Sequence, residues 1–298
     1  MTPANFGEFV MTGAYRKVLL PEEANSFDED RALVITGCGR SGTTLFFRLV
    51  TSTSKLSTKL DEPRELYMSL LGEWFDIWSV KSKQRSGQLC PTEAVNTTFT
   101  PVYRALSPDL PISYIEKTPE HILRLKHLLN LHASTKFVYM RRDWISVALS
   151  IWEITDKSKK PIRWYGAKDC KWLALAKDTV FEKVSDVFVR ATLEWIFSEQ
   201  AYLEAVKDGV DILKVDYETL IDNPSLVSSQ VQEFTNGDFV LDQDLAAKTI
   251  LKKESNFEKL KLFLVGEEPD FGEHLVLKDH LAKVKAQVPI DLIKQFLV

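Results

Sequence analysis

The hydrophobic positions of this chain fall into short apolar runs, each followed by a helical pattern. The first run, from Ala32 to Thr36, is rich in β-branched residues, and an amphipathic helical pattern follows it from Thr43 to Val50. Short continuous apolar runs are typical of parallel strands that are covered on both faces. Strands that alternate with helices in this way predict an α/β fold.

The same arrangement recurs further along the chain. Predicted strands cover Ser57 to Leu60, Ile112 to Ile115, Lys136 to Met140 and Ile212 to Tyr217. Helical patterns run from Trp144 to about Ile154 and from Asp186 to Lys207, and another begins near Ile122. We therefore predict a three-layer α/β fold, in which a mostly parallel central sheet of about five strands has helices on both faces.

The length of 298 residues suits a single α/β domain with additions. Residues 1–30 are polar and irregular, and we interpret them as a lead-in to the first strand. Residues 31–224 carry the strand and helix patterns, and residues 225–298 form a helical, charged C-terminal part. We expect one domain over residues 1–298.

The turn after the first strand has the pattern of a phosphate-binding loop. Gly37, Gly39 and Gly42 permit a tight turn that brings backbone N–H groups close to an anion. The start of the following helix adds unpaired donors and the positive end of its dipole. The spacing matches the P-loop of nucleoside triphosphatases, except that Thr43 stands where that loop has Lys. Arg40 supplies a charge that suits a tetrahedral oxyanion, so an ordinary Mg-ATP enzyme is disfavoured.

Charged side chains also follow the other predicted strands. Glu62 precedes Pro63 at a strand-to-helix junction, where it is either a general base or a helix cap. Lys117 and His121 follow another strand, and His121 is either a base or the donor of a local hydrogen bond. Because the carboxyl ends of parallel strands meet at one edge of the sheet, we expect these side chains near the phosphate loop.

Composition narrows the partners and the compartment. The net charge of −4 gives no field that would steer nucleic acid, so a small-molecule partner is favoured. The three cysteines lack metal-ligand spacing and are odd in number, so we expect no metal and no disulfide framework. Cys38 is interpreted as a small side chain of the loop and not as a nucleophile.

No signal peptide or apolar run of membrane length occurs, so we predict a cytoplasmic protein with no membrane association.

The phosphate loop resembles the first fingerprint of the sulfotransferases that use 3′-phosphoadenosine 5′-phosphosulfate (PAPS). In that family a strand leads into Lys or Arg, then Ser or Thr, Gly, Thr, and Thr or Ser, and a helix follows. The matching residues are Arg40, Ser41, Gly42, Thr43 and Thr44, in the variant with Arg. The resemblance implies that these residues, together with Gly39, bind PAPS as the co-substrate.

Two later segments resemble the same family. Arg142 at a strand end and Ser150, eight residues on, match the pair that holds the 3′-phosphate of the donor. Trp144 and Ser146 depart from the middle of that motif, where the family usually has Pro and an acid. Tyr217 begins a segment similar to the one in which a Tyr lies against the adenine in some branches of the family.

The resemblance also implies roles in catalysis. The segment that contains Lys117 and His121 is similar to one in bacterial-type sulfotransferases, which implies that Lys117 contacts the transferring sulfonate and that His121 acts as the base. Glu62 matches a glutamate that is catalytic in several branches. Lys252 and Lys253 are candidates for the basic loop that closes the donor site in this family.

The predicted function is the transfer of a sulfuryl group from PAPS to a hydroxyl, or to an amine, of a small-molecule acceptor without a metal. The alternatives are a P-loop kinase or nucleotidase, disfavoured by Thr43, and a non-catalytic module that binds the nucleotide. No motif indicates which acceptor is used.

Overall fold

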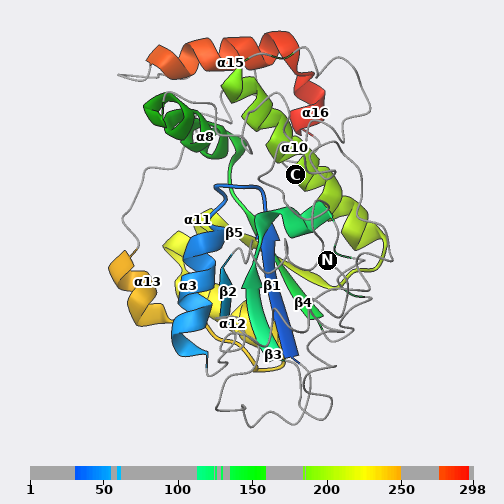
Figure 1. The fold of residues 1–298 in the computed structure, drawn as a ribbon, viewed down its shortest axis with the longest axis vertical. Helices are drawn as coiled ribbons and strands as arrows, with labels where there is room; N and C mark the ends of the chain where they lie inside the picture. The colour runs from blue at the N-terminus through cyan, green and yellow to red at the C-terminus, as the bar shows by residue number, and fades with distance from the viewer. Residues whose placement is uncertain are drawn as a thin grey trace, which may run out of the picture.

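The strands form one parallel sheet that lies between two layers of helices (Figure 1). In the computed structural model, the described residues are 31–54, 59–61, 113–123, 125, 129, 135–158, 184, 186–249 and 275–294. Four strands have five to seven residues: β1 (Arg31–Gly37), β3 (Ser113–Lys117), β4 (Thr135–Arg141) and β5 (Ile212–Asp216). The three-residue strand β2 (Lys59–Asp61) extends the sheet at its edge. The predicted α/β class with a parallel central sheet is confirmed.

The strand order places the phosphate loop at the centre of the sheet. The order is β2-β3-β1-β4-β5, and every neighbouring pair is parallel. β1 therefore lies between β3 and β4. The chain runs from β1 toward β2 on one side of the sheet and from β4 toward β5 on the other, so the direction of the connections reverses between β1 and β4. In open parallel sheets, the crevice beyond the carboxyl ends of strands at such a switch point is where ligands bind.

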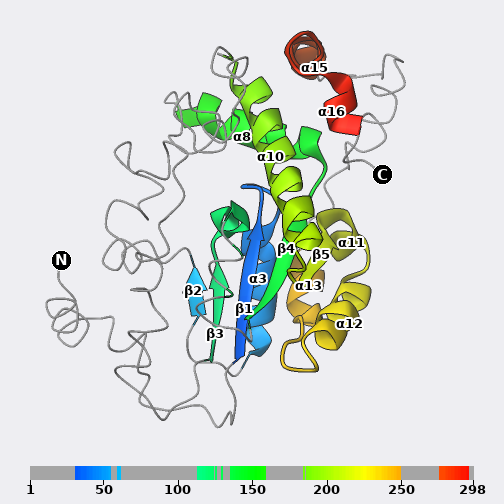
Figure 2. The same cartoon turned by 90° about the vertical axis from the view of Figure 1, so that its right-hand side faces the viewer.

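Alternate residues of β1 face the two helical layers. Leu33 and Ile35 belong to a core with Phe46 and Leu49 of α3 (Thr43–Thr53). Three more helices cover the same face: α11 (Tyr217–Asp222), α12 (Pro224–Phe234) and α13 (Gln243–Thr249). Ala32 and Val34 belong to a core on the opposite face, which α10 (Val187–Lys207) crosses (Figure 2). Both faces of the sheet are thus buried, which explains the continuous apolar runs of its strands.

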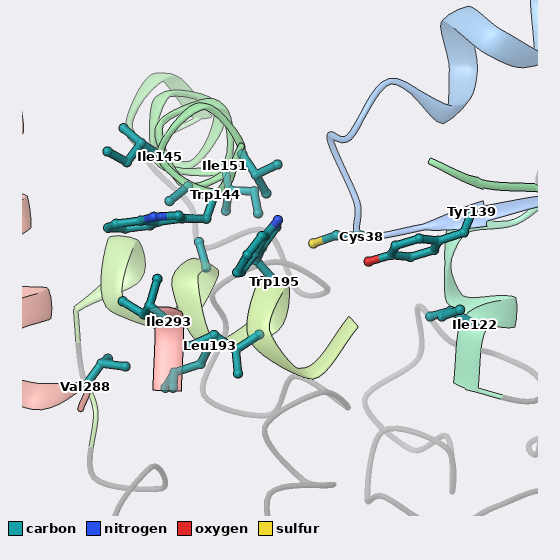
Figure 3. Packing of buried hydrophobic residues seen from close by; sticks show 14 of the residues in the cluster. Cys38, Ile122, Tyr139, Trp144, Ile145, Ile151, Leu193, Trp195, Val288 and Ile293 are labelled. Carbon is teal, nitrogen blue, oxygen red and sulfur yellow. The ribbon is translucent and has the colours of Figure 1, made fainter. Parts of the chain in front are cut away.

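The α10 core continues beyond the sheet into the C-terminal helices. α8 (Trp144–Ser158), α15 (Leu275–Gln287) and α16 (Ile290–Lys294) contribute to it. Figure 3 shows this core from Tyr139 and Cys38 at the sheet, past Trp195 of α10, to Val288 and Ile293. One hydrophobic cluster therefore joins the phosphate loop to the C-terminal helices.

Two segments differ from the sequence prediction. A 3-10 helix, η2 (Pro119–Leu123), comes before the helix that the sequence predicts from about Ile122, in which Leu125 and Leu129 are helical as expected. Tyr217 begins α11 and does not end β5, because Asp216 is the last residue paired with β4. Among the described residues, no helix combines the length and apolarity that crossing a membrane requires.

Candidate active site

The phosphate loop turns sharply at the carboxyl end of β1. Gly37 has φ 148°, and a Cβ there would lie 2.4 Å from the carbonyl oxygen of Met140. The Ser41 hydroxyl donates to the Cys38 carbonyl oxygen over 2.6 Å and closes the turn. α3 then begins at Thr43, with no side-chain cap at Gly42 and no acidic residue in its first turn. The first amides of this helix, which lack intrahelical partners, are thus uncapped, as an anion site requires.

Tyr217 lies against the backbone of this loop. A Cβ on Gly42, which has φ 96°, would lie 2.3 Å from Cδ2 of the Tyr217 ring. The guanidinium of Arg142 lies over the Tyr217 ring, 4.5 Å from its centre. Gly42 is required here both for its conformation and for the space that the aromatic ring occupies.

The two predicted anion-binding segments are in direct contact. Nε of Arg40 donates to the Ser150 hydroxyl over 3.1 Å, which joins the phosphate loop to α8. Nη1 of Arg142 lies 3.4 Å from the Arg40 carbonyl oxygen, and the carbonyl oxygen of Arg142 accepts from Nε1 of Trp195 over 2.8 Å. The structure thus brings Arg40, Arg142, Ser150 and Tyr217 together around one loop.

Lys117 reaches the start of α3 from the neighbouring strand. Its Nζ donates to the Thr44 hydroxyl over 3.2 Å and pairs with Oδ1 of Asp61 over 2.7 Å. The register of β2 and β3 makes Asp61 and Lys117 direct partners. The Lys117 side chain is only 3% exposed, whereas that of Asp61 is 51% exposed. A buried ammonium group requires such a partner, since an unpaired charge in the interior is costly.

His121 is turned toward the opposite face of the sheet. Its side chain is completely buried, and its Nε2 lies 2.5 Å from Oε1 of Glu116. The Thr118 hydroxyl donates to the same oxygen over 3.0 Å. Because successive residues of a strand point to opposite faces, Glu116 and its partner His121 lie on the α10 side, while Lys117 faces α3.

Buried acidic groups lie beneath the loop on the α10 side. Burial, together with the charges of Glu194 and Glu199, raises the pKa of the Cys38 thiol well above its ordinary value. Burial also raises the pKa of Glu199, although Arg141 pairs with it over 3.2 Å. A thiol held in its neutral form fits the interpretation of Cys38 as a packing residue.

The sequence did not single out two acidic residues that contact this site. Asp61 directly precedes Glu62, and its carboxylate binds Lys117. Glu218 was not considered, and it accepts from the Asp143 amide over 3.4 Å beside Arg142. Burial and the Asp143 carboxylate raise the pKa of Glu218 to about 6, although Arg142 opposes this shift. The sequence could have indicated Glu218 as a residue of the site, because it directly follows Tyr217.

Three predicted residues, Glu62, Lys252 and Lys253, lie outside the described residues. Gly39, Ser41 and Thr43 are buried within the loop and the first turn of α3. Within the described part of the chain, no group of His, Cys, Asp and Glu side chains could hold a metal ion.

Comparison with known proteins places the chain in a family. Residues 32–239 match the model of the sulfotransferase family, so the chain belongs to that family. No curated protein sequence gave a significant match.

Several solved sulfotransferase structures are similar to this chain. The sulfotransferase domain of the Synechococcus PCC 7002 olefin synthase is 15% identical, with a TM-score of 0.46 over 93% of this chain and 98% of that one. Sulfotransferase STF9 from Mycobacterium avium is 12% identical, with a TM-score of 0.45 over 78% of this chain and 68% of that one.

Proposed function

We propose that this sulfotransferase uses PAPS as its donor and transfers the sulfuryl group to a hydroxyl, or an amine, of a small-molecule acceptor. The observation that carries the proposal is the hydrogen bond between Arg40 and Ser150. It joins an uncapped helix start to α8, and Arg142, which precedes α8, lies within 3.4 Å of the Arg40 carbonyl oxygen. A nucleotide with phosphate groups at both its 5′ and 3′ ends would engage both segments at once.

Each part of the donor has a partner in this arrangement. The loop from Gly39 to Thr44 would hold the 5′-phosphosulfate through its amides and the Arg40 guanidinium. Arg142 and Ser150 would hold the 3′-phosphate, and Tyr217 would lie against the adenine. Tyr217 packs beside Gly42 and has the Arg142 guanidinium over its ring, so it lies next to both segments that would hold the nucleotide.

The proposed reaction is a displacement at sulfur. The acceptor oxygen attacks the sulfur atom, the bond from sulfur to the bridging oxygen breaks, and adenosine 3′,5′-bisphosphate leaves. The acceptor proton passes to a base, while Arg40 and Lys117 stabilise the charge that grows on the sulfonate and the bridging oxygen. Lys117 suits this role because its Nζ reaches the start of α3, where it donates a hydrogen bond to the Thr44 hydroxyl.

Glu62 is the base that we propose. His121 is completely buried and bonded to Glu116 on the other face of the sheet from Lys117. Glu62 directly follows Asp61, whose carboxylate pairs with Lys117. We therefore expect Glu62→Gln to abolish the acidic limb of the pH-rate profile while nucleotide binding is retained. His121→Gln should instead lower the unfolding temperature, and the reverse pattern would assign the base to His121.

Turnover of PAPS is the direct test of the function. Formation of adenosine 3′,5′-bisphosphate would be measured with water alone and then with a panel of phenols, alcohols and amines. A member of the panel should accelerate bisphosphate formation and carry the sulfuryl group in mass spectrometry. If adenosine 3′,5′-bisphosphate binds but no sulfuryl group is transferred to any compound of the panel, the protein is a module that only binds the nucleotide.

A further inference from the structure

Two carboxylates lie beside Arg142, at the position proposed for the 3′-phosphate. The Glu218 carboxylate accepts from the Asp143 amide over 3.4 Å, and Asp143 directly follows Arg142 in the chain. The Arg142 guanidinium lies over the ring of Tyr217, the residue that precedes Glu218. The subsite therefore combines the guanidinium of Arg142, and that of Arg40 bonded to Ser150, with two acidic groups that would repel a phosphate.

Asp143 is fixed in this position by its own contacts. Its Oδ1 accepts from the Ser146 amide over 2.8 Å and caps the start of α8. The residue is 8% exposed, and its Oδ2 has no hydrogen-bond partner among the described residues. A buried carboxylate oxygen without a donor is costly, and it adds an acidic group close to Glu218.

The other elements near Glu218 do not neutralise it. From β5, Asp216 pairs with Arg141, and the charge of Lys214 acts on Glu199 on the α10 side of the sheet. From α12, the charged side chain is Glu233, which lies in the last turn of that helix. Arg142 is therefore the cation that acts on Glu218, and Asp143 is the anion. A phosphate that takes up Arg142 would leave both carboxylates facing a further negative group.

We propose that Glu218 is a specificity-determining residue for the 3′ end of the nucleotide, and that it takes up a proton when a 3′-phosphate binds to Arg142. The inference rests on the proposed donor. Glu218 acts here through the charge of the subsite, so its state of ionisation sets how strongly a 3′-phosphate is preferred over a free 3′-hydroxyl.

The direction of the pH dependence follows from the charges. In the free protein the pKa of Glu218 is about 6, because the residue is partly buried and lies close to the Asp143 carboxylate. A bound phosphate dianion raises this pKa further, so binding takes up a proton at pH values above about 6. The affinity for a 3′-phosphate is therefore highest below this value and falls as the pH rises, by at most about tenfold per pH unit.

The test is calorimetric titration with adenosine 3′,5′-bisphosphate at about pH 6, 7 and 8, in two buffers of different ionisation enthalpy. Adenosine 5′-monophosphate, which lacks the 3′-phosphate, is the control ligand. For wild type, the buffer dependence should show proton uptake with the bisphosphate that exceeds that with the monophosphate at about pH 7. This measurement needs no variant.

Glu218→Gln imitates the protonated carboxyl group, and Glu233→Gln removes a similar charge from an exposed position. Glu218→Gln should bind the bisphosphate about threefold to tenfold more tightly than wild type at about pH 8, and within about twofold at pH 6. Glu233→Gln should match wild type. The ionisation of the phosphate itself is common to all variants and cancels in this comparison.

The outcomes separate the two proposals. Bisphosphate binding without extra proton uptake, or with the same pH dependence in wild type and Glu218→Gln, overturns the role of Glu218 and leaves the proposed donor intact. Failure of the bisphosphate to bind at every pH contradicts the proposed donor, and the role of Glu218 with it.

Discussion

Arg40 has a backbone conformation that glycine adopts more readily. Its φ is 69°, in the left-handed region, where a residue with a Cβ is disfavoured by about 1 kcal/mol or more. Its side chain is exposed and bonded to Ser150. Strain of this kind is retained where a side chain has a function.

Arg40→Ala and Arg40→Gly should therefore separate function from stability. Both should lower turnover of PAPS by about 100-fold, which is the scale for a lost oxyanion donor. Arg40→Gly should be the more stable of the two by about 1 kcal/mol, because the glycine relieves the strain. Turnover and denaturant unfolding would be measured on all three proteins. Near wild-type turnover in either folded variant would remove Arg40 from the mechanism.

Gly42→Ala tests the contact between the loop and Tyr217. The new Cβ would lie 2.3 Å from the Tyr217 ring, so the ring or the loop must move. Gly209→Ala is a matched control, because Gly209 also has a positive φ, 80°, but no atom lies within 4 Å of its Cβ position. Both substitutions should destabilise the fold through the backbone, by about 1 kcal/mol.

Gly42→Ala alone should also weaken binding of adenosine 3′,5′-bisphosphate, by about tenfold if it displaces a stacking residue. Equal affinities in the two variants would show that Tyr217 does not contact the nucleotide. Thermal unfolding and calorimetric titration would provide both quantities.

Motifs that are local in the sequence indicated part of the candidate site. The glycines and Arg40 lie in one turn and indicated the phosphate loop, whereas Arg142 and Ser150 were indicated by the resemblance to the family. The contact between Asp61 and Lys117 depends on the register of β2 against β3. The burial of His121 depends on Glu116 and on which face of the sheet it occupies. Neither can be deduced from spacing along the chain.

At the scale of elements, α15 packs against α8 and α10 through His280. The imidazole stacks on Phe188 at 4.7 Å and lies edge-on to Trp152 at 4.8 Å. Neither ring nitrogen has a hydrogen-bond partner among the described residues. Burial lowers the pKa of His280, although the charge of Asp186 opposes this shift. The neutral imidazole is therefore the form that packs here.

The packing of α15 should consequently weaken in acid. The unfolded chain binds the proton of His280 more readily than the folded one, so stability is full above about pH 6.5 and falls as the pH drops below that value. His280→Phe keeps an aromatic ring against Phe188 without the titrating group. Its unfolding temperature should fall less than that of wild type between about pH 7 and 5. Parallel curves for the two proteins would contradict this role of His280.

The sequence predicted helices and strands well wherever a periodic pattern of hydrophobic residues determined them. The helix expected from Asp186 to Lys207 is α10, which begins after Asp186 because that carboxylate accepts from the amides of Phe188 and Val189. The helix expected from about Ile122 is preceded by the 3-10 helix η2, which the sequence did not indicate. There the Thr36 hydroxyl donates to the Pro119 carbonyl oxygen over 2.6 Å, a tertiary contact that no local pattern contains.

At the scale of the whole molecule, the order of strands and helices predicted the layered fold, because parallel strands require crossover connections and covered faces. The strand order, with β1 between β3 and β4, adds what the sequence did not show: how segments distant in the chain converge on one loop. Our account therefore depends on one claim, that this edge of the sheet binds a nucleotide with phosphates at both ends.

Thermal unfolding with chelator present tests that claim most directly. Adenosine 3′,5′-bisphosphate should stabilise the protein, by about 2.7 kcal/mol at a hundred times its dissociation constant. Adenosine 5′-phosphosulfate, which lacks the 3′-phosphate, should stabilise it less at the same concentration, and Arg142→Ala should remove most of that difference. If Mg-ATP, tested without chelator, stabilises the protein more than the bisphosphate does, or if the bisphosphate has no effect at saturation, PAPS is not the donor and the account is wrong.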